Sequence, residues 1–339
     1  MRFLITQMVL LLLGIVCAIS VLAQDDVGSK LLPFHGERGF GFIDVSGKIK
    51  IPARFGNVSR FSEGVAAVEV EGAWRFITTN GDIAFQGTFV EARPFSEGLA
   101  AVKVAGGRWG FINRKGEFSI NPKFLYVRDF HEGLAQVATD GQMFQGGFQG
   151  KKGFIDKKGG LIILPQFDEA GDFSEGLAWT EVNGWRVFVD TCGMRAFSGQ
   201  FTWTGNFSEG LAPVSVDKKV GFIDKKGSFV IAPSYKFAED FSEGLASAQL
   251  GSKCGYIDRS GDVKIPFTFR ECKSFSEGFA AVQPLAKTTD WGYIDIEGRL
   301  TIRPAYQLVG PFLFGRAQVF TANGRYYIDK TGSRITIEE

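Results

Sequence analysis

This chain has few histidines and no excess of positive or negative charge. Among 339 residues there are two histidines, His35 and His131, and 38 Lys and Arg residues stand against 37 Asp and Glu residues. A formal net charge of +1 provides no broad electrostatic field, which argues against nucleic acid or an anionic membrane surface as the partner. The sequence also lacks a paired-histidine metal motif, a nucleophile elbow, an EF-hand loop and a phosphate-binding glycine motif. We therefore expect neither catalysis nor a metal or other cofactor.

Cysteine is equally sparse. Setting aside Cys17, which lies in an N-terminal apolar segment, an odd number remains: Cys192, Cys254 and Cys272. They form no close pairs and have no histidine neighbours, so their spacing indicates neither a zinc site nor a disulfide framework. Cys254 and Cys272 take positions that hold Trp or Ala in other copies of the repeat described below, which is typical of small apolar fillers. A bond between them stays open as an alternative, because exported proteins tolerate disulfides.

Long apolar runs are missing after the first residues. The N-terminus has a basic start at Arg2, an apolar stretch from Met8 to Ile19 and a small residue, Ala23, at its end. This order predicts a signal peptide over residues 1–23, cleaved after Ala23. A membrane anchor is the alternative, but the apolar stretch is shorter than the about 20 residues that span a bilayer. We expect residues 24–339 to be exported, periplasmic or extracellular, without a membrane span.

Glycine and phenylalanine, by contrast, are abundant, and they recur in a fixed pattern. The chain has 44 Gly and 34 Phe residues. The tetrapeptide FSEG or a close variant recurs at intervals of 34, 35, 43, 34, 34, 34 and 37 residues, beginning at Phe61, Phe95, Phe130, Phe173, Phe207, Phe241, Phe275 and Phe312. So regular a period predicts a repeat architecture over residues 24–339, in about nine units of which the first and last are incomplete.

Each copy has the pattern of short antiparallel strands. After FSEG, apolar residues alternate over about six positions, as in 99–104, which is typical of a half-buried strand. A second strand such as 109–113 ends in a turn with glycine at a constant place, and a third ends at a proline, which has no N–H to continue a ladder. The segment before FSEG is long enough for a fourth, shorter strand. The predicted fold is all-β, with meander units of about 34 residues.

The FSEG residues have a structural explanation. One Phe per unit would build an aromatic ladder between stacked copies, while Ser and Gly shape a turn. The Glu row has two interpretations: ligand or cation sites, or carboxylates that accept backbone or Trp N–H groups from a neighbouring unit because a partly buried charge needs partners. We favour the second. The row consists of Glu63, Glu97, Glu132, Glu175, Glu209, Glu243 and Glu277.

The pattern resembles the WG-containing repeat family, also called KWG repeats, which is named for a Trp-Gly pair. Trp109-Gly110 and Trp291-Gly292 match that pair, and FSEG, GFID and the turn glycine recur together in order. Several units depart from it, since the Trp position holds Phe40, Val220 and Cys254, which argues against an essential chemical role for this Trp. The resemblance implies a bacterial repeat protein with a presumed binding role and no established activity.

Repeats that contact only their neighbours form an open solenoid or close into a propeller. The chain contains nine hairpins but eight links, and the 43-residue interval is irregular. Both observations favour an open, solenoid-like array, with a closed β-propeller as the alternative.

Binding residues are expected where the repetition breaks. The insert 139–150 carries Phe144 and Phe148, which can stack on sugar rings or a peptide or belong to a hairpin without a ligand. Trp179, Trp185 and Trp203 crowd another unit. Trp179 is a binding residue if its strand face is exposed, and a core residue if a neighbouring unit covers it.

These features favour a non-catalytic exported module that binds a protein or a cell-envelope polysaccharide. A structural spacer is one alternative. A glycan-acting hydrolase is another, but it needs two carboxylates that differ from the rest, whereas the repeated Glu residues resemble one another.

Overall fold

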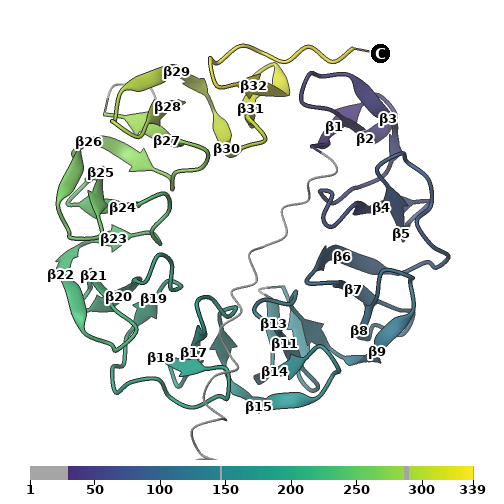
Figure 1. Cartoon of the computed structure of the whole chain (residues 1–339), viewed down its shortest axis with the longest axis horizontal. Coiled ribbons are helices and arrows are strands. Elements are labelled where there is room, and N and C mark those ends of the chain that lie inside the picture. Colours follow the sequence, from purple (N-terminus) through teal and green to yellow (C-terminus); the bar gives the residue numbers. More distant parts are fainter. Residues whose placement is uncertain (1–29, 146, 286–289, 339) are drawn as a thin grey trace, which may run out of the picture.

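The computed structural model describes residues 30–145, 147–285 and 290–338, and their regular elements are all strands. The chain runs once around a ring, from the purple first unit to the yellow last one (Figure 1). The first units contain β1 (Leu32–Gly36), β2 (Gly39–Ile43), β3 (Ile49–Phe55), β4 (Val65–Val70), β5 (Ala73–Thr78), β6 (Glu91–Ser96), β7 (Leu99–Lys103), β8 (Trp109–Ile112), β9 (Phe118–Phe124), β10 (Tyr126–Val127), β11 (Leu134–Ala138), β12 (Gln142–Phe144), β13 (Gly147–Gln149), β14 (Lys152–Asp156) and β15 (Leu161–Phe167).

The remaining strands continue in the same way. They are β16 (Glu169–Ala170), β17 (Leu177–Val182), β18 (Trp185–Asp190), β19 (Trp203–Thr204), β20 (Ala212–Val216), β21 (Lys219–Ile223), β22 (Phe229–Tyr235), β23 (Phe237–Ala238), β24 (Leu245–Leu250), β25 (Lys253–Asp258), β26 (Val263–Cys272), β27 (Phe279–Pro284), β28 (Trp291–Asp295), β29 (Leu300–Tyr306), β30 (Leu308–Leu313), β31 (Arg316–Thr321) and β32 (Gly324–Asp329).

Within the described residues these strands form nine units, numbered here in chain order. A complete unit has four antiparallel strands, a to d, counted from the ring centre outward; β19, β20, β21 and β22 of unit 6 are the example. Units 7 and 8 share one seven-stranded sheet, because the end of β26 serves as strand a of unit 8. The hairpin β12–β13 is an addition to unit 4. The predicted all-β meander repeat, including its short fourth strand, is confirmed.

The SEG part of the motif forms the two-residue hairpin turn between strands a and b. Glu and Gly both have positive φ, with values of 52° to 56° for the seven Glu residues and 81° to 87° for the glycines that follow them. The flanking residues pair across the turn, as Ser208 does with Leu211. Two consecutive positive φ values define the type I′ turn that matches strand twist. Glutamate is unusual in this conformation, so its presence in seven such turns needs a separate cause.

The cause is a hydrogen bond from the next unit to the glutamate side chain. Each Glu carboxylate accepts the backbone N–H of the glycine one unit later, at 2.7 to 3.1 Å, from Glu63 with Gly98 through Glu277 with Gly315. The motif serine donates to the carbonyl of the next motif phenylalanine at 2.6 to 2.9 Å, except in unit 4, where His131 replaces it. Charge-assisted bonds of this kind are stronger than neutral ones. The Glu row thus has the structural arrangement that the sequence analysis favours.

The motif phenylalanine packs between units as well. Its ring meets the central aromatic ring of strand c in the preceding unit, with centroids 4.7 to 5.3 Å apart and mostly edge-to-face. Phe207, for example, is fully buried against Phe188 at 4.8 Å. The ladder therefore alternates two aromatic positions rather than stacking one motif ring on the next.

The two ends of the array contact each other. Residue Glu338 pairs in parallel with Lys48, and its backbone exchanges hydrogen bonds with Gly47 and Ile49 at 3.1 Å. Arg316 of unit 9 also donates through Nε to the Val45 carbonyl at 2.7 Å. The first and last units of the described residues therefore contact each other in a propeller-like arrangement of repeats. The 43-residue interval contains the additional hairpin β12–β13.

We predict that Phe207→Ala lowers the free energy of unfolding by about 3 to 5 kcal/mol, since it empties a buried site between two units. Phe229→Ala on an outer strand is the control, because that side chain is 45% exposed. Thermal and chemical unfolding of both variants measure the effect. Equal losses in the two variants would contradict the inter-unit role of Phe207.

Candidate binding surface

The two faces of the ring carry different loops. The turns between strands a and b and between c and d lie at one end of every unit, with the Glu row. The turns between b and c lie at the other end, together with the first residues of strand a, since Phe237 at the start of β23 pairs with Gln249 at the end of β24. We call this second end the b–c face. Because the Glu end is occupied by inter-unit bonds, sequence variation that leaves the ring intact belongs on the b–c face.

The insert of unit 4 forms a hairpin on the b–c face. Met143 and Phe144 are exposed there, by 70% and 55% respectively. Phe148, from the returning strand β13, stacks on Tyr126 of β10 at 5.2 Å. The predicted residues Phe144 and Phe148 thus have different surroundings, one ring free and one resting on the start of an inner strand.

Lys152 occupies the Trp position of unit 4. Its side chain is 2% exposed, and Nζ donates to the Asp168 carbonyl and to Glu169 Oε1, both at 2.6 Å. The same ammonium group lies 5.8 Å from the Tyr126 ring. A buried lysine needs such partners, and here they fix the position of Tyr126 and Glu169 at the start of two neighbouring inner strands.

The two predicted binding tryptophans of unit 5, Trp179 and Trp185, have different surroundings. Trp179 is partly buried against the core formed with unit 6, and the Arg186 guanidinium covers its ring at 4.0 Å. Arg186 is held in turn by Glu181 at 3.0 Å. Trp179 therefore has the surroundings of a core residue, the alternative left open by the sequence. Trp185, by contrast, is 49% exposed at the start of β18, on the b–c face.

Trp203 begins the inner strand of unit 6. It packs on the core between units 6 and 7. Its ring lies 5.5 Å from that of Phe237, which begins the inner strand of unit 7 and is 45% exposed. Tyr126 has the equivalent position in unit 4. In units 3, 5 and 8 this position holds Glu91, Glu169 and Glu271.

Six aromatic residues of units 4 to 7 therefore lie at the same end of the ring. We call them the aromatic arc: Tyr126, Phe144, Phe148, Trp185, Trp203 and Phe237. Tyr126 and Phe237 were missed by the sequence analysis. Alignment of the position two residues after the Phe or Tyr that ends each unit would have found them, because that position is aromatic or leucine in some units and glutamate in others.

The inner strands also place acidic groups at the ring centre. Asp240, which precedes the motif phenylalanine of unit 7, accepts the Asn206 backbone N–H at 3.0 Å. Burial raises the pKa of Asp240 to about 6, and the neighbouring Glu239 adds to this, while the bonds from Asn206 oppose it. Glu239 itself accepts the Ser274 hydroxyl at 2.6 Å.

This raised pKa predicts a pH-dependent stability. The folded pKa of about 6 exceeds the ordinary value of 3.8, so between these values the folded state binds the extra proton and stability falls as the pH rises. Asp240→Asn should be more stable than the parent at pH 8, and the difference should shrink toward pH 4. Unfolding midpoints at both pH values test this, with Asp217→Asn as the exposed control. A pH-independent difference would contradict it.

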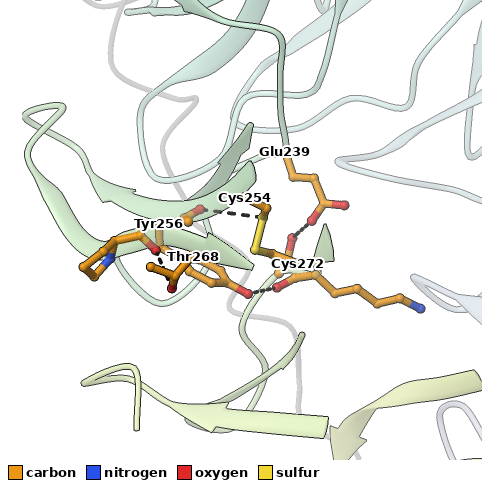
Figure 2. Close-up of a disulfide and its surroundings, with 9 residues drawn as sticks. Glu239, Cys254, Tyr256, Thr268 and Cys272 are labelled. Carbon is orange, nitrogen blue, oxygen red and sulfur yellow. Dashed lines mark hydrogen bonds between the residues drawn. A yellow bond between two sulfur atoms is a disulfide. The ribbon is translucent and has the colours of Figure 1, made fainter. Parts of the chain in front are cut away.

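A disulfide joins units 7 and 8. Cys254 of β25 is bonded to Cys272 at the end of β26, with the Cα atoms 6.0 Å apart (Figure 2). The Trp position of one unit faces the inner strand of the next, as Trp109 does in a core cluster with Val127. Two cysteines at these equivalent positions are therefore adjacent although 18 residues separate them. The expected apolar fillers are covalently linked, while Cys192 is a free, exposed thiol.

Reduction of this bond should lower the free energy of unfolding by about 3 kcal/mol on a chain-entropy estimate for a loop of this length. Cys254→Ser should have a similar effect, and Cys192→Ser should have little. Unfolding with and without reductant, together with mass analysis after alkylation, provides the measurement. Labelling of Cys254 and Cys272 before reduction would show that the bond is absent.

The comparisons with known proteins identify the family. Eight segments match the family described as WG containing repeat: residues 40–74, 74–107, 109–142, 153–184, 196–219, 221–254, 255–283 and 291–326. These segments cover most of the chain. The protein belongs to the WG-containing repeat family, which confirms the resemblance. No curated protein matches the chain in sequence.

Solved structures are similar to the chain at low sequence identity. A eukaryotic initiation factor is 10% identical, with 91% of this chain and 95% of that chain covered and a TM-score of 0.60. BamB from Moraxella catarrhalis is 10% identical over 88% of this chain and 96% of that one, with a TM-score of 0.45. AztD from Citrobacter koseri is 11% identical over 91% and 94%, with a TM-score of 0.41. At 10% identity the likeness to the initiation factor concerns the fold alone, a propeller-like arrangement of β-repeats.

Two further observations concern only the described residues. No helix in that part of the chain has the length and apolar character needed to cross a membrane. In the same ranges, no group of three His, Cys, Asp or Glu side chains is placed to hold a metal ion.

Proposed function

We propose that this WG-repeat protein is a non-catalytic, exported binding module that holds a protein ligand on its aromatic arc. The observation that carries the proposal is the gathering of six aromatic residues on one face of units 4 to 7, three of them 45% to 55% exposed. The fold does not require this, because glutamate fills the equivalent inner-strand position in units 3, 5 and 8.

The chemistry of the arc suits a protein ligand. Trp, Tyr, Phe and Met are enriched at protein interfaces and supply most of the binding energy there. Met143, 70% exposed, borders the arc at Phe144, and Leu250, 51% exposed, borders it at Phe237. The Glu181–Arg186 and Lys152–Glu169 ion pairs lie between the aromatic groups and add polar specificity.

A cell-envelope polysaccharide is the second candidate. The half-exposed Trp185 ring beside the Glu181 and Arg186 pair favours it, because a sugar ring can stack on the indole while its hydroxyl groups bond to the charged neighbours. A spacer is less well supported, since it has no use for exposed aromatic residues that vary between units.

Two observations support the rest of the proposal. Each carboxylate of the Glu row accepts a backbone N–H of the following unit, and four of them also pair with Arg114, Lys157, Lys225 and Lys330. These contacts support a structural task for the row. The Cys254–Cys272 bond suits an oxidising compartment, in agreement with the predicted signal peptide.

A photo-crosslinking amino acid at Phe144 or Trp185, introduced in the native cell, should capture the same ligand from both positions. The same group at Met194, 66% exposed on the opposite face, should not capture it. The double variant Phe144→Ala, Trp185→Ala should bind the captured ligand at least about tenfold more weakly, with an unchanged unfolding midpoint. Glycan-array binding by the purified chain would favour the polysaccharide. If neither position yields an adduct and no glycan binds, the arc is not a binding site.

A further inference from the structure

The contact between units 9 and 1 differs from the other contacts between units. Elsewhere a motif phenylalanine packs on the strand-c ring of the preceding unit, with centroids 4.7 to 5.3 Å apart. The strand-c ring of unit 9 is Tyr327, which packs with Leu32, Phe34 and Ile43 of the neighbouring unit 1 (Figure 1). Among the described residues, no motif phenylalanine contacts Tyr327.

A cavity of about 120 Å³ lies beside Tyr327. Leu32, Leu313 and Tyr327 give it an apolar part, and Arg60 and Arg316 bring two guanidinium groups to it. An engineered cavity of about 150 Å³ holds a benzene molecule, so this one has room for a single ring or a branched aliphatic group. Arg60 is exposed, which leaves its guanidinium accessible to a ligand.

Arg316 is a change of residue type at this cavity. In other units the residue after the motif glycine is apolar: Val65, Leu99, Leu134, Leu177, Leu211, Leu245 and Phe279. Arg316 lies opposite Leu313, which takes the place of the motif serine. Its Nε and Nη1 donate to the carbonyls of Val45 at 2.7 Å and Gly315 at 2.8 Å. The guanidinium group is thereby held in place at the wall of the cavity.

The position of Arg316 indicates which group it can bind. In other units the motif serine donates to the carbonyl of the next motif phenylalanine, as Ser276 does to Phe312 at 2.7 Å. In unit 9 the hydroxyl is lost at Leu313, and a cation lies opposite it. Guanidinium groups bind carboxylates through paired, charge-assisted hydrogen bonds. A ligand whose carboxylate replaces the motif carbonyl, and whose apolar group replaces the motif ring, therefore matches both parts of the cavity.

The charge around Tyr327 also suits an anion. Burial raises the pKa of Tyr327 to about 12, and the positive charges of Arg60 and Arg325 oppose this rise. The Tyr327 hydroxyl donates to the Pro33 carbonyl at 2.9 Å. Asp329 lies opposite Arg316 in the strand register, but its carboxylate accepts hydrogen bonds within its own turn.

We propose that this cavity binds a carboxylate carried by one compact apolar group. The apolar group packs against Tyr327 in the place of a motif ring, and the carboxylate lies between Arg316 and Arg60. Two sources share this chemistry: the C-terminal residue of a polypeptide and a small organic acid. The site is separate from the aromatic arc, so this inference does not rest on the proposed function.

Calorimetric binding of three probes to the purified full chain tests the chemistry of the ligand. The peptide N-acetyl-glycyl-glycyl-leucine should bind, and its C-terminal amide should bind at least about tenfold more weakly, because the charge-assisted bonds are lost. The free acid 4-methylpentanoate distinguishes the two sources. Tighter binding of the peptide assigns the site to a polypeptide C-terminus, and equal or tighter binding of the free acid assigns it to small organic acids.

Variants of the two arginines test the place of the carboxylate. Arg316→Leu restores a residue found in other units, and Arg60→Gln changes an exposed side chain. Each should weaken binding of the peptide at least about tenfold. Arg108→Gln, in the b–c turn of unit 3, is the matched control because that arginine is exposed and distant from the cavity in the repeat. It should bind the peptide as the parent does.

A cavity-filling variant keeps both arginines. Leu32→Phe should occupy the space against Tyr327 and abolish binding of the peptide, and thermal unfolding shows whether this variant is folded. If it does not fold, Arg60→Gln decides, since that change affects an exposed side chain.

Three results would overturn the proposal. The first is a peptide that gives neither a binding signal nor a rise in the unfolding midpoint at millimolar concentration. The second is an amide that binds as well as the acid, and the third is full affinity in either arginine variant or in folded Leu32→Phe. The double variant Phe144→Ala, Trp185→Ala should keep full affinity for the peptide, so failure at one site is distinguishable from failure at the other.

Discussion

The bond between a glutamate carboxylate and the next unit's backbone is the interaction on which the ring depends. A glutamate with φ near 54° is unfavourable in isolation, yet this turn recurs in seven units. The conformation points the carboxylate at the following glycine N–H, and the motif serine bonds the adjacent carbonyl. Local strain in one unit is thus offset by contacts with its neighbour. Units of about 34 residues that bury little alone become stable only in series.

This dependence explains where the sequence is constant and where it varies. The Glu end and the aromatic pairs between strands c and a determine the spacing of the units, so their residues recur. The b–c turns and the first residue of each inner strand lie outside the Glu row and the pairs between strands c and a. They can change from Glu169 to Trp203 or Phe237 without altering the ring, and a 43-residue interval is accommodated there as a hairpin. Recognition can therefore evolve on the b–c face at little structural cost.

The contact between the Trp position of one unit and the inner strand of the next is kept even where the residue types change. The Trp position of one unit faces the inner strand of the next, and the contact survives as Trp with Val, as a buried Lys152 with Glu169, or as the Cys254–Cys272 bond. Unit 9, which follows no standard motif, lies beside a unit without a described inner strand. In unit 9, Leu313 and Phe314 replace the motif Ser and Glu. Among the described residues, the unit that follows it around the ring has no inner turn to which those side chains could bond.

Periodicity alone determined the strands, the turns, the meander unit and the family, because alternation, turn glycines and prolines act within a few residues of one another. It also indicated the structural task of the Glu row. The arrangement in a ring, the core environment of Trp179, the disulfide and the inclusion of Tyr126 and Phe237 in the arc were decided only by tertiary structure. Each depends on which residue of one unit faces which residue of the next, and that register arises from packing between units rather than from the order of residues within one.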